Sequence, residues 1–118
     1  MACVLVVDDE ADIRQAVSEI LADEGYVVVG ARDGAEALAQ ARAAHPSLVL
    51  LDLMMPRMNG WEFREAQRQD PELAKIPVVV LSALARDKGI DASGYIEKPF
   101  DLDDLLTAVR RHTGPPSA

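Results

Sequence analysis

The chain has 118 residues, a formal net charge of −8 and one cysteine. This length suits one domain with its own core, and a single cysteine excludes an internal disulfide framework or a cysteine-cluster zinc site. The negative charge argues against direct binding to nucleic acid phosphates or anionic lipid. No apolar run approaches the roughly 18 residues of a membrane span, and no signal-peptide pattern is visible. We therefore expect a soluble, cytoplasmic protein with a domain over 1–113 and a flexible tail over 114–118.

Short apolar runs alternate along the chain with amphipathic segments. The first run, 3–7, is continuously apolar, as expected of a parallel strand that is buried on both faces. Apolar residues then recur at helical spacing from Ile13 to Leu21, and Gly25 follows as a helix stop. The second run, 26–29, comes directly after it. This part of the chain is therefore predicted to be strand, helix and strand.

Two further helices are predicted from their N-terminal signals. In a capping box, the N-cap side chain and a Glu three residues later bond each other's backbone N–H groups. Asp33 and Glu36 have this spacing before an alanine-rich segment. Asn59 and Glu62 have it again, after the third apolar run at 48–51. We expect a helix to begin at each pair.

The last part of the chain departs from this regular alternation. A fourth run, 78–81, and a fifth strand ending before Lys98 are predicted. Between them, 84–92 offers nine residues, including Gly89, whereas an average helix takes about 11–12. The fourth helix is therefore expected to be shortened or absent. Asp101 is the predicted N-cap of a final amphipathic helix.

Alternating strands and helices with right-handed crossovers predict an α/β, flavodoxin-like, doubly wound sheet of five parallel strands in the order 2-1-3-4-5. Ligand chemistry in such folds belongs at the carboxyl ends of the strands. Asp8 and Asp9 follow the first strand, Asp52 the third, Ser82 the fourth and Lys98 the fifth. Each alone has an ordinary explanation as a helix cap, a strand end or a solvated charge. Their joint placement at one edge of the sheet predicts a functional site.

Three carboxylates in a small space repel one another, which raises their pKa values or requires a cation. Magnesium prefers carboxylate and carbonyl oxygens and keeps several waters, so Asp8 or Asp9, Asp52 and the backbone carbonyl of Met54 would form a partial coordination shell. Asp52 would then be a nucleophile that attacks a phosphorus centre and forms an acyl phosphate. The sequence thus predicts Mg2+-dependent phosphoryl transfer to an aspartate.

Several segments of the chain resemble the response-regulator receiver family of two-component signalling, including its single-domain, chemotaxis-regulator-like members. The segments that carry the resemblance are Val6-Val7-Asp8-Asp9-Glu10, Leu50-Leu51-Asp52-Leu53-Met54-Met55-Pro56 with Asn59-Gly60, Leu81-Ser82-Ala83, and Tyr95-Ile96-Glu97-Lys98-Pro99-Phe100. Together they span nearly the whole chain, and in combination they are specific. The resemblance implies that Asp8 and Asp9 bind magnesium and that Asp52 accepts the phosphoryl group. It also implies that Ser82 and Lys98 sense the phosphate and that Tyr95 switches between two rotamers.

The same resemblance implies a function in a phosphorelay. A sensor histidine kinase or a phosphotransfer protein would donate the phosphoryl group, and a downstream protein target would read it. The domain would catalyse only its own phosphorylation and dephosphorylation, so it is not an enzyme in the usual sense. Because the fourth helix belongs to the dimer face in the family, its shortening predicts a monomer or a weak dimer. For Tyr95, an ordinary strand aromatic at the sheet edge remains an equal alternative.

Three other functions are weighed against this one. The first is a receiver-like interaction module that is not phosphorylated, which the short fourth helix favours and the complete polar set opposes. The second is an aspartyl-nucleophile phosphatase, which needs a second acid two residues after the nucleophile, where this chain has Met54. The third is a flavin-binding electron carrier. Its cofactor carries a phosphate, which the carboxylates of Asp8 and Asp9 would repel. We therefore predict a phosphorylatable receiver domain.

Overall fold

The computed structural model describes residues 2–52, 58–82, 92–97 and 101–113. Its strands are β1 (Cys3–Val7), β2 (Val27–Ala31), β3 (Leu48–Asp52), β4 (Val78–Ser82) and β5 (Gly94–Glu97). Its helices are α1 (Ala11–Asp23), α2 (Gly34–Ala44), α3 (Gly60–Arg68), α4 (Pro71–Ala74) and α5 (Leu102–Thr113). The strands form one parallel sheet in the order β2-β1-β3-β4-β5. The predicted fold class and strand order are confirmed.

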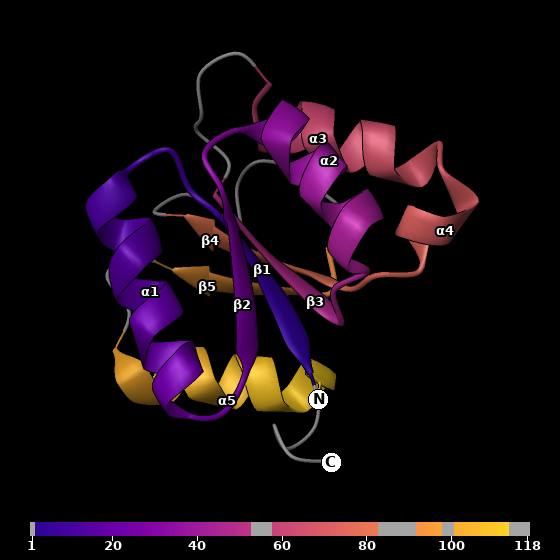
Figure 1. Cartoon of the computed structure of the whole chain (residues 1–118). Coiled ribbons are helices and arrows are strands. Elements are labelled where there is room, and N and C mark those ends of the chain that lie inside the picture. The colour runs from indigo at the N-terminus through magenta and orange to yellow at the C-terminus, as the bar shows by residue number, and fades with distance from the viewer. Residues whose placement is uncertain (1, 53–57, 83–91, 98–100, 114–118) are drawn as a thin grey trace.

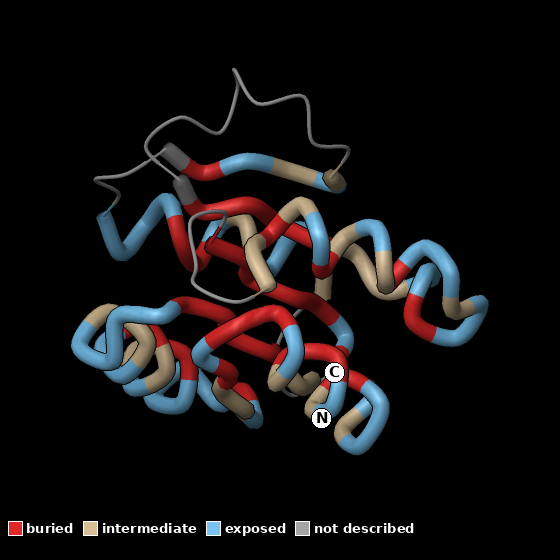
Figure 2. The backbone as a smooth tube through the Cα atoms, turned by 90° about the horizontal axis from the view of Figure 1, so that it is seen from above, coloured by how far each residue is buried: buried red, intermediate tan, exposed pale blue. Residues whose placement is uncertain are grey.

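The sheet lies between two layers of helices. Helices α1 and α5 cover one face, and α2 and α3 cover the other (Figure 1). Because successive side chains of a strand point to opposite faces, Val4 and Val6 of β1 belong to the core on the α1 and α5 side, whereas Leu5 and Val7 belong to the core beneath α2 and α3. In Figure 2 most residues of the central strands are coloured as buried, whereas the helices on either side carry many exposed residues. Burial on both faces explains why these strands read as continuous apolar runs.

The predicted helix signals are found in the structure, with one difference in detail. Asn59 accepts from the N–H of Glu62 at 2.9 Å, and the Glu62 carboxylate accepts from the N–H of Asn59 at 3.1 Å, so this capping box is complete. At α2, Asp33 accepts from the N–H of Glu36 at 2.9 Å. The Glu36 carboxylate, however, accepts from the N–H of Arg32 at 3.1 Å, one residue before the expected donor. The helix still begins where the pattern predicts.

The short helix α4 was not among the predicted elements. It begins after the N-cap Asp70, with Pro71 at its first position, a pattern that favours a helix start. The fully buried side chain of Gln67 holds the connection from α3 to β4, because its Nε2 donates to the carbonyl oxygens of Leu73 at 2.8 Å and Ile76 at 3.0 Å. Helix α4 precedes β4, so it is not the helix expected between β4 and β5.

Two predictions fall on parts of the chain that the structure does not describe. The shortened or absent fourth helix was predicted for 84–92, of which only residue 92 is described, and the tail was predicted for 114–118. Both stay predictions, as do the domain bounds of 1–113. Within the described ranges, every helix is too short or too polar to cross a lipid bilayer.

Candidate metal centre

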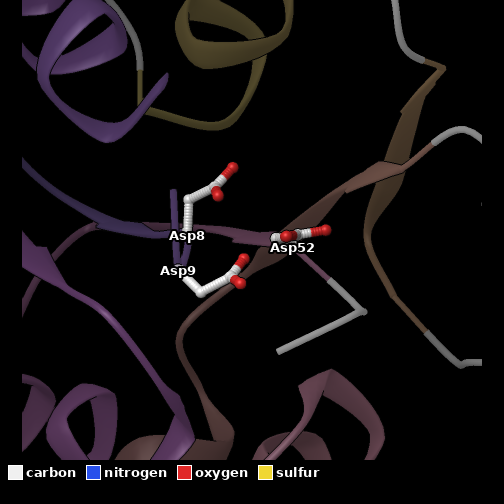
Figure 3. Close-up of side chains that lie close together, drawn as sticks. All are labelled: Asp8, Asp9 and Asp52. Atoms are coloured by element: carbon white, nitrogen blue, oxygen red, sulfur yellow. The ribbon is translucent and has the colours of Figure 1, made fainter. Parts of the chain in front are cut away.

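Three aspartates meet at the carboxyl-terminal edge of the sheet. Asp8 and Asp9 directly follow β1, and Asp52 is the last residue of the neighbouring strand β3. The register pairs Val7 of β1 with Leu51 of β3, which places Asp8 beside Asp52. Figure 3 shows the carboxylates of Asp8 and Asp9 extending toward the side on which Asp52 lies. One oxygen from each of the three carboxylates lies within 4.8 Å of the other two.

The three carboxylates differ in exposure. The side chains of Asp8 and Asp52 are buried, with 1% and 6% of their surface exposed, whereas Asp9 is exposed. The cluster therefore consists of two buried carboxylates, those of Asp8 and Asp52, and the solvent-exposed carboxylate of Asp9. Oxygen ligands with access to water suit Mg2+, which binds through a few carboxylates and keeps several waters. The donor set fits a hard divalent cation.

The position of Asp8 is set by hydrogen bonds from separate parts of the fold. Its N–H donates to the carbonyl oxygen of Ala31 at 3.1 Å, which extends the β1–β2 pairing by one residue. Its Oδ1 accepts from the N–H of Glu10 at 2.9 Å. Its carbonyl oxygen accepts from Nη1 of Arg14 at 2.7 Å. Sequence reasoning missed Arg14, because a charged residue in the first turns of a helix carries no signal of what it contacts.

The other predicted site residues are described only in part. Ser82 ends β4, one residue beyond the partner of Asp52 in the register, so its backbone lies at the same edge of the sheet. Tyr95 lies in the edge strand β5, where 43% of its surface is exposed. Lys98 and Met54 lie outside the described residues. The structure thus brings together the three predicted carboxylates, and the roles of the remaining residues stay predictions.

A model of the response regulator receiver domain matches residues 4–110 of this chain. The chain belongs to the response-regulator receiver family. Within that family, this receiver domain is 39% identical to the chemotaxis response regulator CheY4 of Vibrio cholerae, whose structure superposes with a TM-score of 0.86. That comparison covers 94% of this chain and 98% of CheY4. The resemblance seen in the sequence is therefore confirmed.

Two curated relatives show the range of proteins that carry a similar domain. The DNA-binding dual master transcriptional regulator RpaA of Synechocystis sp. is 40% identical over 93% of this receiver domain and 48% of its own length. Protein PilG of Pseudomonas aeruginosa is 31% identical over 92% of this receiver domain and 85% of its own length. The chain spans about half the length of RpaA and of the other transcriptional regulators that it matches first.

Proposed function

We propose that this receiver domain accepts a phosphoryl group on Asp52 in a Mg2+-dependent reaction and that phosphorylation changes which proteins it binds. The observation that carries the proposal is the cluster of three carboxylates, with oxygens within 4.8 Å of one another, at the carboxyl-terminal edge of the sheet in a receiver domain. Asp8, Asp9 and Asp52 would hold the ion, together with the backbone carbonyl of Met54. A bound Mg2+ would neutralise the crowded carboxylates and offer its open positions to phosphate oxygens.

The chemistry of the proposal is a single phosphoryl transfer. A carboxylate oxygen of Asp52 forms a bond to the donor phosphorus, and the bond from phosphorus to the donor breaks. The electron pair of that bond leaves with an imidazole nitrogen when the donor is a phosphohistidine, or with a carboxylate oxygen when it is acetyl phosphate. Such a transfer depends mostly on positioning and charge neutralisation. The ammonium of Lys98 and the hydroxyl of Ser82 would contact the transferred phosphoryl oxygens.

The partners of the proposed reaction are proteins. A sensor histidine kinase or a phosphotransfer protein would supply the phosphoryl group in the cytoplasm, and a downstream protein would recognise the phosphorylated form. The domain itself would act only on its own Asp52 and would be a monomer or a weak dimer. We do not propose that this chain contacts DNA, since its net charge of −8 would repel phosphate.

The proposal is tested by incubation with acetyl phosphate and Mg2+, followed by mass spectrometry of the intact protein. We expect the mass of one phosphoryl group on the wild type and none after EDTA treatment or in Asp52→Asn. Asp12→Asn is the matched control, because Asp12 is an exposed carboxylate in the first turn of α1 and is not part of the cluster. Its uptake should equal that of the wild type. If the wild type takes up no phosphate, the chain is better described as an interaction module without chemistry.

A further inference from the structure

The side chain of Arg14 reaches back from α1 to the metal-centre end of β1. Its Nη1 donates to the carbonyl oxygen of Asp8 at 2.7 Å, and the contact is partly buried. Its aliphatic stem lies over Gly30 of β2, where an added Cβ would lie 3.4 Å from the Arg14 Cδ and 3.7 Å from its Cγ. An added Cβ would be in ordinary van der Waals contact with the stem, which therefore lies close against the surface of β2. The guanidinium is held by packing as well as by its hydrogen bond.

This hydrogen bond completes the restraint of the Asp8 backbone. The N–H of Asp8 is paired with Ala31 of β2, and its carboxylate is oriented by the N–H of Glu10. The remaining backbone group of Asp8 that can hydrogen bond is its carbonyl oxygen, which accepts from the charged guanidinium of Arg14. Hydrogen bonds from charged groups are shorter and about twice as strong as neutral ones. A shift of Asp8, or of the turn that carries Asp9, would have to break it.

We propose that Arg14 is a positioning residue of the metal centre. It holds the end of β1 so that the carboxylates of Asp8 and Asp9 are already placed for a divalent cation, and it does so through a backbone carbonyl without touching the ion. The inference rests on the proposed function, because it requires that these carboxylates bind Mg2+. Residues that orient metal ligands in this indirect way typically change metal affinity by about 10- to 100-fold when they are removed.

Two effects of Arg14 on Mg2+ binding have opposite signs, and this makes the proposal testable. Its positive charge repels a cation, so charge alone predicts tighter Mg2+ binding when Arg14 is replaced by a neutral residue. Its hydrogen bond to Asp8 orders the site, so positioning predicts weaker binding after the same replacement. Arg14→Met removes the charge and the donor but keeps a linear apolar stem over Gly30. The direction of the change in Kd therefore separates the two roles.

The experiment is isothermal titration of Mg2+ into the wild type, Arg14→Met, Arg14→Lys and Arg110→Met. Arg110 is an exposed arginine paired with Glu24 at 2.7 Å, and Glu24 is the C-cap of α1, near the start of β2 and away from the carboxyl-terminal edge of the sheet. Arg110→Met therefore removes the same charge far from the metal centre. We expect the Kd of Arg14→Met to rise about tenfold, that of Arg14→Lys to rise less, and that of Arg110→Met to stay at or slightly below the wild-type value.

A second measurement separates positioning from a general loss of structure. The rate of phosphorylation by acetyl phosphate is followed as a function of Mg2+ concentration. The half-saturating concentration for Arg14→Met should rise by the same factor, while the rate at saturating Mg2+ matches the wild type. Binding by Arg14→Met that is as tight as wild type, or tighter, overturns the inference, and so does a loss of rate that saturating Mg2+ does not restore. If Arg14→Met does not fold, Arg14→Lys carries the test by the same two criteria. Absence of Mg2+ binding by the wild type would instead refute the proposed function and, with it, this inference.

Discussion

Replacing Asp9 by asparagine should stabilise the metal-free protein although it removes a predicted metal ligand. Asp9 is the exposed member of the carboxylate cluster, and its charge lies near two others that are buried. Without a cation, the three negative charges repel one another in the folded state and are far apart in the unfolded chain. Neutralising one of them should therefore raise the free energy of unfolding.

The separations in the cluster give the size of this effect. The carboxylate oxygens lie within 4.8 Å of one another, and two unit charges at this upper limit repel by about 0.9 kcal/mol in water, so Asp9 experiences at least about 1.7 kcal/mol from its two neighbours before screening. With a Debye length of about 8 Å, physiological salt reduces this to roughly 1 kcal/mol. Asp9 also precedes the N-cap of α1, where a negative charge gains about 0.3 kcal/mol from the helix dipole. The net stabilisation by Asp9→Asn should be about 0.7 kcal/mol.

Magnesium should reverse the order of stability. At a concentration 100 times its Kd, a ligand that binds only the folded state stabilises it by about 2.7 kcal/mol. If the loss of one carboxylate raises the Kd tenfold, the same Mg2+ concentration stabilises the variant by only about 1.4 kcal/mol. This loss of about 1.3 kcal/mol exceeds the gain from reduced repulsion. The wild type should then be the more stable protein.

Urea unfolding in EDTA and in Mg2+, followed by circular dichroism, measures both differences. Asp12→Asn is the control, because it removes a carboxylate from the first turn of α1 but not from the cluster, and it should destabilise the protein slightly in both buffers. In EDTA with 1 M NaCl, where the Debye length is about 3 Å, the advantage of Asp9→Asn should shrink. A variant less stable than the wild type in EDTA at low salt would show that repulsion in the cluster is not significant and that the three carboxylates do not require a cation.

Three further predictions concern the fold that carries the metal centre. A Cβ on Gly34 would lie 2.8 Å from the backbone oxygen of Met58. Gly34→Ala should therefore lower the free energy of unfolding, measured in urea, by about 1–3 kcal/mol. Gly30→Ala is the control and should be close to neutral, because its nearest contact would be at 3.4 Å. Gln67→Leu removes the donor to two carbonyl oxygens of the connection from α3 to β4 and should cost about 2–4 kcal/mol; a loss below 0.5 kcal/mol would mean that water replaces the amide. Burial raises the pKa of the Cys3 thiol above its value in the unfolded chain. The contribution of the protonated thiol to folding stability is therefore fully present below the unfolded-state pKa and is lost as the pH rises through the folded-state pKa. Alkylation of Cys3 by iodoacetamide at pH 8 should accordingly be slower in the native protein than in urea, and equal rates would contradict that shift.

Local sequence patterns were sufficient to predict most of the elements. Caps such as Asn59 with Glu62 act within one helical turn, so their hydrogen bonds can be read from residue spacing alone. The continuous apolar run at 3–7 identifies a strand buried on both faces. The carboxylate cluster was also predictable, because Asp8, Asp9 and Asp52 follow strands whose carboxyl ends meet at one edge in any sheet of this topology.

The tertiary structure alone decided the contacts between segments and the environment of each side chain. Spacing could not show that Asp52 is buried while Asp9 is exposed, that the amide of Gln67 holds the connection from α3 to β4, or that Arg14 donates to the carbonyl of Asp8. The sequence by itself determined the order of the elements and the edge at which the carboxylates gather, because hydrophobic periodicity, capping and strand-end position are local properties. Exposure, partners and distances depend on how helices pack on the sheet and which rotamers that packing allows, and these become definite only when the whole chain is folded.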